Sequence, residues 1–308
     1  PRRRRAVFIF NQPQMRKPFV VFAQAKNIIG IVNFFQRKPL RVMFDFESFP
    51  LKNNEVPEFQ LVSINQLNPQ KAPLFEAVSE RGDLSKNILT KAYLKIFPYL
   101  NDKIGIRVHL TKRIPPEGGI GGGSSNAGSL LRELFPLTSL NPIEKNQLAK
   151  SIGADVPFFL QDQNCFVSGI GDILEPIKIG KAYGILAIPR HSLSTKAMYE
   201  GLQKSLQNTL DSKIWKTLTE DVIRNLQVGD WKSLNGILEN EFEKVAFQTH
   251  SDLKELKLGF LQNGAEYASL SGSGSCFYGL VSSKTAQEVL LNSMRLQFSD
   301  VDFVSFSI

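Results

Sequence analysis

Residues 115–125 read Pro115-Pro116-Glu117-Gly118-Gly119-Ile120-Gly121-Gly122-Gly123-Ser124-Ser125. The alternating pattern of Ile104–Leu110 predicts a strand before this stretch, and the apolar residues of 130–135 predict a helix after it. Glycines lack a Cβ, so their backbone N–H groups can approach an anion closely, and a following helix adds the positive end of its dipole. The stretch therefore predicts a phosphate-binding loop, in which the serine hydroxyls could hold phosphate oxygens or a magnesium-bound water.

This glycine loop differs from two common nucleotide-binding motifs. No Lys-Ser/Thr pair follows its last glycine, as a Walker A loop requires, and the third glycine of the dinucleotide fingerprint is missing. A flexible linker is the alternative interpretation. It is disfavoured because the predicted strand and helix flank the loop without spacers.

A second glycine-rich segment, Ser271-Gly272-Ser273-Gly274-Ser275, lies between residues 267–270 and 276–281, which are predicted to be strands. This segment could line the other side of a phosphate-binding site. Its small residues could equally serve close packing of the backbone, and the pattern alone does not decide between the two.

A third segment reads Gly153-Ala154-Asp155-Val156-Pro157-Phe158-Phe159 and follows a predicted helix that Asn141 caps and Gly153 ends. Burial would raise the pKa of Asp155, whereas a nearby cation would lower it and keep the carboxylate ionised. An ionised aspartate could accept a hydroxyl proton during phosphoryl transfer. A capping or turn aspartate is the alternative interpretation.

Together, these three segments resemble the GHMP kinases. Residues 115–127 are similar to their phosphate-loop motif P-x-x-x-G-L-G-G-G-S-S-N-A, with Ile120 for leucine and Glu117 where glycine is usual, and residues 269–274 are similar to their C-terminal glycine motif. Residues 153–159, 169–176 and 238–243 are similar to the branch of the superfamily that phosphorylates 4-diphosphocytidyl-2-C-methyl-D-erythritol. The resemblance covers residues 84–308.

The resemblance implies an α+β fold of two domains. The N-terminal domain would be like domain 2 of ribosomal protein S5, and the C-terminal domain would be a ferredoxin-like α/β domain. We expect an N-terminal extension at 1–14, the ATP-binding domain at 15–178 and the C-terminal domain at 179–308, with the substrate in the cleft between the domains.

The resemblance also implies an activity, which is ATP-dependent phosphorylation of the substrate's 2-hydroxyl, a step of non-mevalonate isoprenoid biosynthesis. Asp155 would be the base, and Lys26 would pair with it and steady the transferring phosphoryl group. Magnesium would arrive bound to ATP, without a dedicated protein site. The ATP-binding residues would be Pro115, Pro116, Glu117, Gly118, Gly119, Ile120, Gly121, Gly122, Gly123, Ser124 and Ser125, and the second glycine loop would be Ser271, Gly272, Ser273 and Gly274.

The N-terminal segment departs from the family pattern A-K-[IL]-N-L, because Asn27 follows Lys26 directly. The family's D-G-Y-H segment near the cytosine pocket is also absent, and residues 39–42 stand in its place. Several interpretations stay open: a divergent pocket, an error in this stretch, a GHMP kinase for homoserine, mevalonate or a sugar, and a non-catalytic nucleotide-binding homologue. Lys26 itself could instead be a lysine whose head reaches solvent at a strand end.

Composition argues against a nucleic-acid-binding, membrane-spanning or zinc-binding protein. The chain has 308 residues, of which 42% are hydrophobic and 21% charged, as in globular proteins. Its net charge of +8 comes without a nucleic-acid reader motif, and polar residues interrupt its most apolar stretch, 19–35. Cys165 and Cys276 match no zinc spacing. We expect a cytoplasmic monomer or homodimer that binds neither nucleic acid nor membrane.

The remaining periodicity predicts further elements. Helices are expected at 83–100, 211–226, 231–247 and 285–296, and strands at 183–188 and 301–308. Residues 165–177 predict a hairpin, and residues 39–82 predict strands joined by irregular loops.

Overall fold

The computed structural model describes residues 6–9, 29–32, 43–51, 56–65, 87–112, 118–161, 164–168, 173–205 and 212–308. These residues form two compact units. The described residues of 41–116 and 121–161 form the first, here called the central unit, and those of 1–40, 117–120 and 162–308 form the second, called the C-terminal unit. The expected domain division near residue 178 stays a prediction.

The central unit contains a three-stranded sheet in the order β3-β5-β4, formed by Met43–Pro50, Ile104–Lys112 and Phe59–Asn65. Strand β3 runs antiparallel to β5, and β4 runs parallel to it. The predicted period of two in β5 is confirmed, because Ile106, Val108 and Leu110 are all buried in one hydrophobic core. The sheet thus presents an apolar face on which helices pack.

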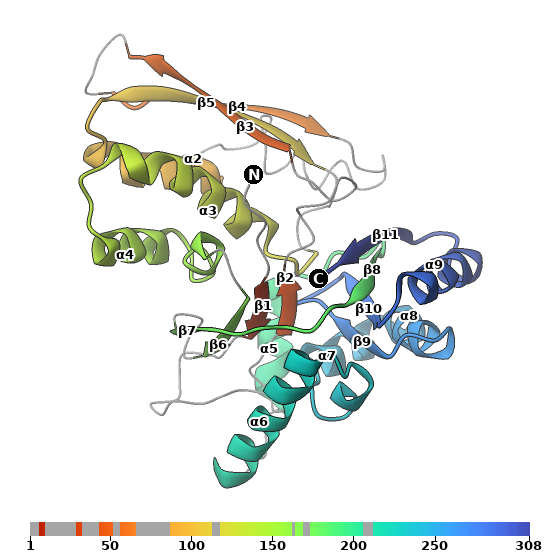
Figure 1. Ribbon diagram of the computed structural model, residues 1–308. Helices are drawn as coiled ribbons and strands as arrows, with labels where there is room; N and C mark the ends of the chain where they lie inside the picture. Colours follow the sequence, from red (N-terminus) through yellow and green to blue (C-terminus); the bar gives the residue numbers. More distant parts are fainter. Residues whose placement is uncertain are drawn as a thin grey trace. The chain divides into compact units, whose positions relative to one another are not determined.

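Helices α2 (Ile88–Ile96), α3 (Gly122–Leu134) and α4 (Pro142–Ile152) complete this unit. Figure 1 shows α2 and α3 along one face of the sheet, with α4 on the far side of these helices. Short 3-10 turns follow at Phe97–Tyr99, Phe135–Leu137 and Phe158–Leu160. Helix α4 begins and ends as predicted, because Asn141 forms a capping box with Glu144 and Gly153 is the C-cap.

Helix α3 begins earlier than the sequence pattern predicted. It starts at Gly122, inside the glycine run, rather than after Ser125. Gly121 precedes the helix in the left-handed conformation, with φ of 66°, which a residue without a Cβ adopts at little cost. The last two glycines and both serines of the loop therefore form the first turn of the helix.

The C-terminal unit contains a four-stranded antiparallel sheet in the order β11-β8-β10-β9. Its strands are Asp302–Ser307, Tyr183–Ile188, Phe277–Val281 and Tyr267–Leu270, all close to the predicted ranges. Helices α8 (Ser251–Gln262) and α9 (Lys284–Gln297) pack on this sheet. The other helices are α5 (Thr195–Ser205), α6 (Ser212–Val228) and α7 (Phe242–Thr249).

Two further strand pairs belong to the C-terminal unit. The predicted hairpin is confirmed as β6 (Cys165–Ser168) and β7 (Ile173–Pro176), and β1 (Ala6–Ile9) pairs with β2 (Ile29–Val32). Strand β1 also contacts β6.

The prediction of one helix over 231–247 is wrong. A 3-10 turn occupies Lys232–Leu234, and α7 begins only at Phe242. Gly236 adopts a left-handed conformation with φ of 80°, which ends any regular helix there. Asn240 then turns the chain into α7, because its side-chain oxygen accepts a hydrogen bond from the backbone N–H of Phe242. Helices α5 and α8 were not predicted.

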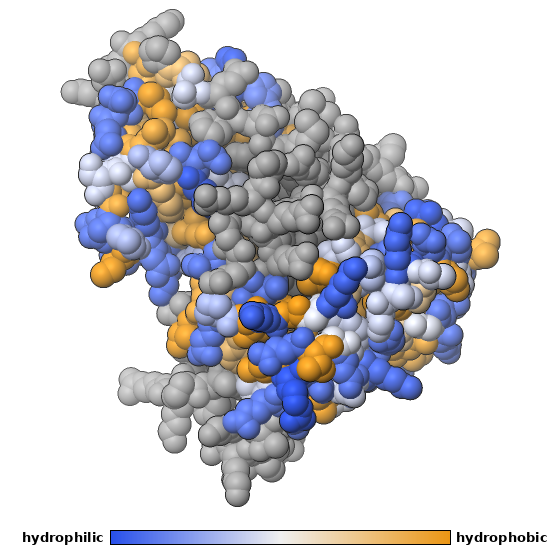
Figure 2. Space-filling view, viewed as in Figure 1, coloured by the Kyte–Doolittle hydropathy of each residue, from blue (hydrophilic) through white to orange (hydrophobic). Residues whose placement is uncertain are grey.

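The described surface is mixed in character. Figure 2 shows hydrophilic and hydrophobic residues interspersed on this face. Among the described residues, no helix is long and apolar enough to cross a membrane. Cys165 and Cys276 are both buried.

Candidate active site

The start of α3 provides backbone donors. The first N–H groups of a helix have no acceptor within the helix, and within the described residues no side chain caps this end. The first intrahelical bond runs from the Ser125 N–H to the Gly121 carbonyl, at 2.8 Å. A Cβ on Gly121 would lie 2.8 Å from Phe159 Cζ, so both the conformation and the space at this position favour glycine. The amides at 122–124 can therefore donate to an anion.

Asp155 lies in the turn that follows α4, and two cationic side chains hold the ends of this turn. The Lys91 ammonium, from α2, donates to the Ile152 carbonyl at 2.7 Å. The Arg132 guanidinium, from α3, donates to the Phe159 carbonyl at 2.7 Å. Charged donors make stronger hydrogen bonds than neutral ones, so the Asp155 turn is fixed against both helices.

Packing brings the Asp155 turn to the start of α3. A methyl group at Gly123 would meet Ile88 Cγ2 at 3.6 Å, and one at Gly153 would meet Ile88 Cδ1 at 3.8 Å. Ile88 therefore lies between the two segments. Further along α3, a Cβ at Gly128 would lie 2.6 Å from Phe159 Cβ, so this glycine allows the turn to approach the helix closely.

Burial changes the acidity of Asp155. The side chain is half-buried, and the loss of water around its charged form raises its pKa from 3.8 to about 7. A carboxyl group with this pKa is about half ionised at neutral pH and suits proton transfer. Lys26, the predicted partner that would lower this pKa, lies outside the described residues, as do Pro115, Pro116 and Glu117.

The described start of the first glycine loop, Gly118–Ile120, contacts the second glycine loop within the C-terminal unit. The Ser271 hydroxyl donates to the Gly119 carbonyl at 3.2 Å, and the Cys276 N–H donates to the Gly118 carbonyl at 3.3 Å. A Cβ on Gly119 would lie 1.8 Å from the Ser271 carbonyl oxygen, and one on Gly272 would lie 2.3 Å from the Gly119 carbonyl oxygen. The small residues thus permit close packing of two backbones. That the second loop also lines a phosphate-binding site stays a prediction.

Several positioning residues were not found from the sequence. Lys91 and Arg132 donate to backbone carbonyls, and a carbonyl leaves no mark on the residue type that carries it. Asn240 lies within residues 238–243, which the family resemblance singled out, but the hydrogen bond between its side chain and the Phe242 N–H was not predicted. Asn240 is a buried polar residue next to the start of α7, and a buried polar side chain requires hydrogen-bond partners.

Comparison with family models identifies the class. The model described as GHMP kinases N terminal domain matches residues 87–163, and the model described as GHMP kinases C terminal matches residues 222–300. The chain therefore belongs to the GHMP kinases.

Curated relatives narrow this class. The chain is 57% identical over 252 residues to the 4-diphosphocytidyl-2-C-methyl-D-erythritol kinase of Leptospira biflexa, covering 82% of each chain. It is 45% identical over 264 residues to the enzyme of that name from Leptospira interrogans, covering 85% of this chain and 88% of the relative. Within the GHMP kinases, the chain belongs to the 4-diphosphocytidyl-2-C-methyl-D-erythritol kinase family.

Solved structures share the fold. A 4-(cytidine 5'-diphospho)-2C-methyl-D-erythritol kinase superposes with a TM-score of 0.66 at 21% identity, covering 99% of this chain and 98% of that chain. The mevalonate kinase of L. major, in complex with R-mevalonate, superposes with a TM-score of 0.64 at 15% identity, covering 100% and 98%. These likenesses confirm the predicted GHMP kinase fold.

Proposed function

We propose that the chain transfers the γ-phosphoryl group of ATP to the 2-hydroxyl of 4-diphosphocytidyl-2-C-methyl-D-erythritol. The observation that carries this proposal is a half-buried carboxyl group, Asp155, on a turn that is fixed beside the start of α3, which no described side chain caps. The identity of 57% to the 4-diphosphocytidyl-2-C-methyl-D-erythritol kinase of Leptospira biflexa supports the choice of substrate.

The chain's own residues supply binding and proton transfer. Backbone N–H groups at the start of α3, together with the described glycines of the first loop, bind the phosphates of ATP. Ser124 and Ser125 add hydroxyl donors in the first turn of the helix. A magnesium ion bound to ATP would neutralise negative charge on its β- and γ-phosphates.

Asp155 accepts the proton of the substrate hydroxyl as the alcohol oxygen forms its bond to the γ-phosphorus. The bond between this phosphorus and the bridging oxygen of the β-phosphate breaks, and ADP leaves with the electron pair. The ionised form of Asp155 is the active form, because a protonated carboxyl group cannot accept a further proton. Lys26 would stabilise the transferring phosphoryl group.

The choice of substrate is tested by measuring ADP release from Mg-ATP with the cytidine-diphospho-methylerythritol, beside homoserine, mevalonate and galactose. Turnover with the first alcohol alone is the expected result. Turnover with another alcohol would keep the GHMP chemistry but overturn the substrate, and ATP binding without turnover would support a non-catalytic homologue.

The role of Asp155 is tested with Asp155→Asn. This variant should lose turnover by about 10²- to 10⁴-fold while its ATP affinity stays within about twofold, because only proton transfer is removed. The matched control is Asp230→Asn, at an exposed aspartate of the C-terminal unit, which should keep full activity. Normal turnover of Asp155→Asn would rule out the proposed base.

A further inference from the structure

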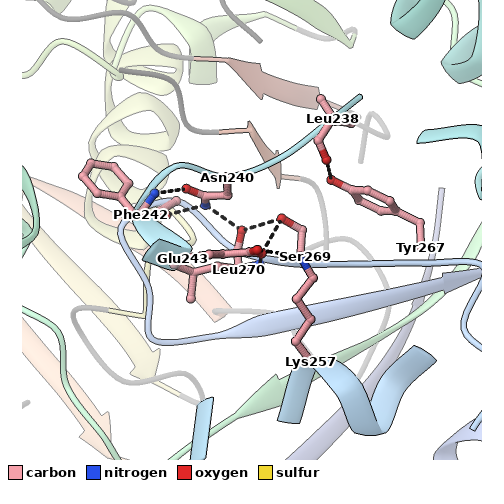
Figure 3. A network of polar contacts seen from close by, with 9 residues as sticks. Leu238, Asn240, Phe242, Glu243, Lys257, Tyr267, Ser269 and Leu270 are labelled. Atoms are coloured by element: carbon pink, nitrogen blue, oxygen red, sulfur yellow. Dashed lines mark hydrogen bonds and ion pairs between the residues drawn. The ribbon is translucent and has the colours of Figure 1, made fainter. Parts of the chain in front are cut away.

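Asn240 joins the start of α7 to the second glycine loop. Its side chain is 2% exposed, and its amide nitrogen donates to the carbonyls of Leu270 and Gly272, at 2.9 and 2.8 Å. Its amide oxygen accepts from the Phe242 N–H at 3.0 Å. Both N–H groups of the side-chain amide are thus bound to the loop backbone, as Figure 3 shows for Leu270.

Glu243 holds the same loop from one turn further along. One carboxylate oxygen accepts from the Leu270 N–H at 2.8 Å and from the Ser269 hydroxyl at 3.2 Å. The other accepts from the Lys257 ammonium, in α8, at 2.5 Å (Figure 3). The Glu243 side chain is almost fully buried, so without Lys257 and these donors its charge would be costly.

The two side chains therefore bind both backbone groups of Leu270, the last residue of β9. Glu243 accepts from its N–H, and Asn240 donates to its carbonyl. Two residues earlier than Asn240, the Leu238 carbonyl accepts from the Tyr267 hydroxyl at 2.8 Å, which ties the same segment to the start of β9. Residues 238–243 thus fix both the start and the end of β9.

The loop held in this way is the one that contacts Gly118 and Gly119. The approach is too close for any side chain at Gly119 or Gly272, and the hydrogen bonds from Ser271 and Cys276 join the two backbones. A displacement of the second loop would consequently displace the described start of the first loop.

We propose that Asn240 and Glu243, with Lys257 as the counter-ion, are positioning residues that set the conformation of the first glycine loop through the second. The consequence for ATP rests on the proposed function, because it assumes that the first loop binds the phosphates. The alternative is that the three residues stabilise only the C-terminal unit and have no effect on the first loop.

The principal variant is Asn240→Asp, which keeps the acceptor for Phe242 but replaces the donors to the loop with a carboxylate oxygen. Its matched control is Asn235→Asp. Asn235 also donates from one side-chain nitrogen to two backbone carbonyls, those of Lys232 and Glu266. It lies at an exposed position, and neither carbonyl belongs to a glycine loop.

A second pair of variants covers the case in which Asn240→Asp does not fold. Glu243→Gln/Lys257→Met keeps an oxygen for Leu270 and Ser269 while removing both charges, so it should behave like the unmodified protein. Glu243→Ala/Lys257→Met removes the acceptor as well and should behave like Asn240→Asp. Glu266→Gln is the control for replacing a glutamate with glutamine. Glu266 likewise accepts hydrogen bonds from a backbone N–H and a hydroxyl, both of Ser282, but at an exposed site.

Two measurements are made on each variant. Hydrogen exchange at the Cys276 amide, which donates to the Gly118 carbonyl, reports the contact between the loops and needs no ATP. Calorimetric titration with a non-hydrolysable ATP analogue reports nucleotide affinity, and steady-state kinetics separate the KM for ATP from the KM for the alcohol.

For Asn240→Asp, and for Glu243→Ala/Lys257→Met, we expect Cys276 exchange and the Kd for the analogue each to rise about tenfold or more, with the KM for the alcohol within about twofold. The controls and Glu243→Gln/Lys257→Met should match the unmodified protein. Faster exchange with unchanged nucleotide affinity would overturn the proposal, as would no change in either. Failure of the unmodified protein to bind the analogue would refute the proposed function instead, and exchange at Cys276 would still decide whether these residues position the loops.

Discussion

Asp155→Asn is expected to stabilise the fold at neutral and alkaline pH while removing activity. Burial raises the pKa of Asp155 from 3.8 to about 7, so the folded state resists ionisation that the unfolded chain allows. Each unit of pKa difference corresponds to about 1.4 kcal/mol, which gives a cost of about 4 kcal/mol once the carboxyl group is ionised in both states. Asparagine carries no charge and avoids this cost.

The sign of this stability change and the pH range in which it appears follow from the linkage between protonation of Asp155 and folding. Below about pH 4, Asp155 is protonated in both the folded and the unfolded states, and the cost is absent. The cost grows as the pH rises from about 4 to about 7 and is complete above that range. The gain from Asp155→Asn should therefore increase from about 2 kcal/mol at pH 5 to about 4 kcal/mol at pH 8.

The assay is urea unfolding of the unmodified protein and of Asp155→Asn at pH 5, 6, 7 and 8. A difference in the free energy of unfolding that stays constant across this range would refute the reasoning that burial raises the pKa of Asp155. Paired with a loss of turnover, that result would indicate that Lys26 neutralises Asp155 in the folded protein.

Asp230→Asn is the control for sign. Asp230 is exposed, and hydrogen bonds from the Ser233 hydroxyl and N–H lower its pKa. Its ionised form is favoured in the folded state, so the same substitution should slightly destabilise the protein at neutral pH. A stabilisation by both substitutions would show that the effect is not specific to the burial of Asp155.

Further predictions concern the glycines, the fixed turn and the rate. Gly119→Ala should be strongly destabilising and should weaken ATP binding, because its Cβ would overlap a backbone oxygen at 1.8 Å; Gly236→Ala, also at positive φ but in open space, should cost only about 1 kcal/mol in thermal unfolding. Lys91→Met should lower kcat about tenfold with little change in the KM for ATP, whereas Lys95→Met on the same helix should leave both unchanged. The specificity constant kcat/KM should rise with pH through an apparent pKa near 7 as Asp155 ionises. A kcat/KM that stays constant between pH 5 and 8 would contradict the role of Asp155 as the base.

Local patterns accounted for most elements. The capping box of α4 and its terminal glycine are set by residues within three or four positions of one another, so the helix bounds followed from the sequence. The strand β5 and the buried strand β8 followed from periodicity. The prediction failed at 231–247, where apolar residues continue on both sides of Gly236 but the chain leaves the helix to place Asn240 against β9.

The sequence by itself determined the segments from which the proposed site is built, which are a glycine loop before a helix, a second glycine loop and an aspartate after a capped helix. Only the tertiary structure decided how these parts are held. Lys91 reaches a carbonyl 61 residues away, Arg132 reaches one 27 residues away, and Asn240 reaches one 32 residues away. Each of these side chains donates to a backbone oxygen, and every residue type carries the same backbone oxygen. Such partners therefore become identifiable only when folding has brought the segments together.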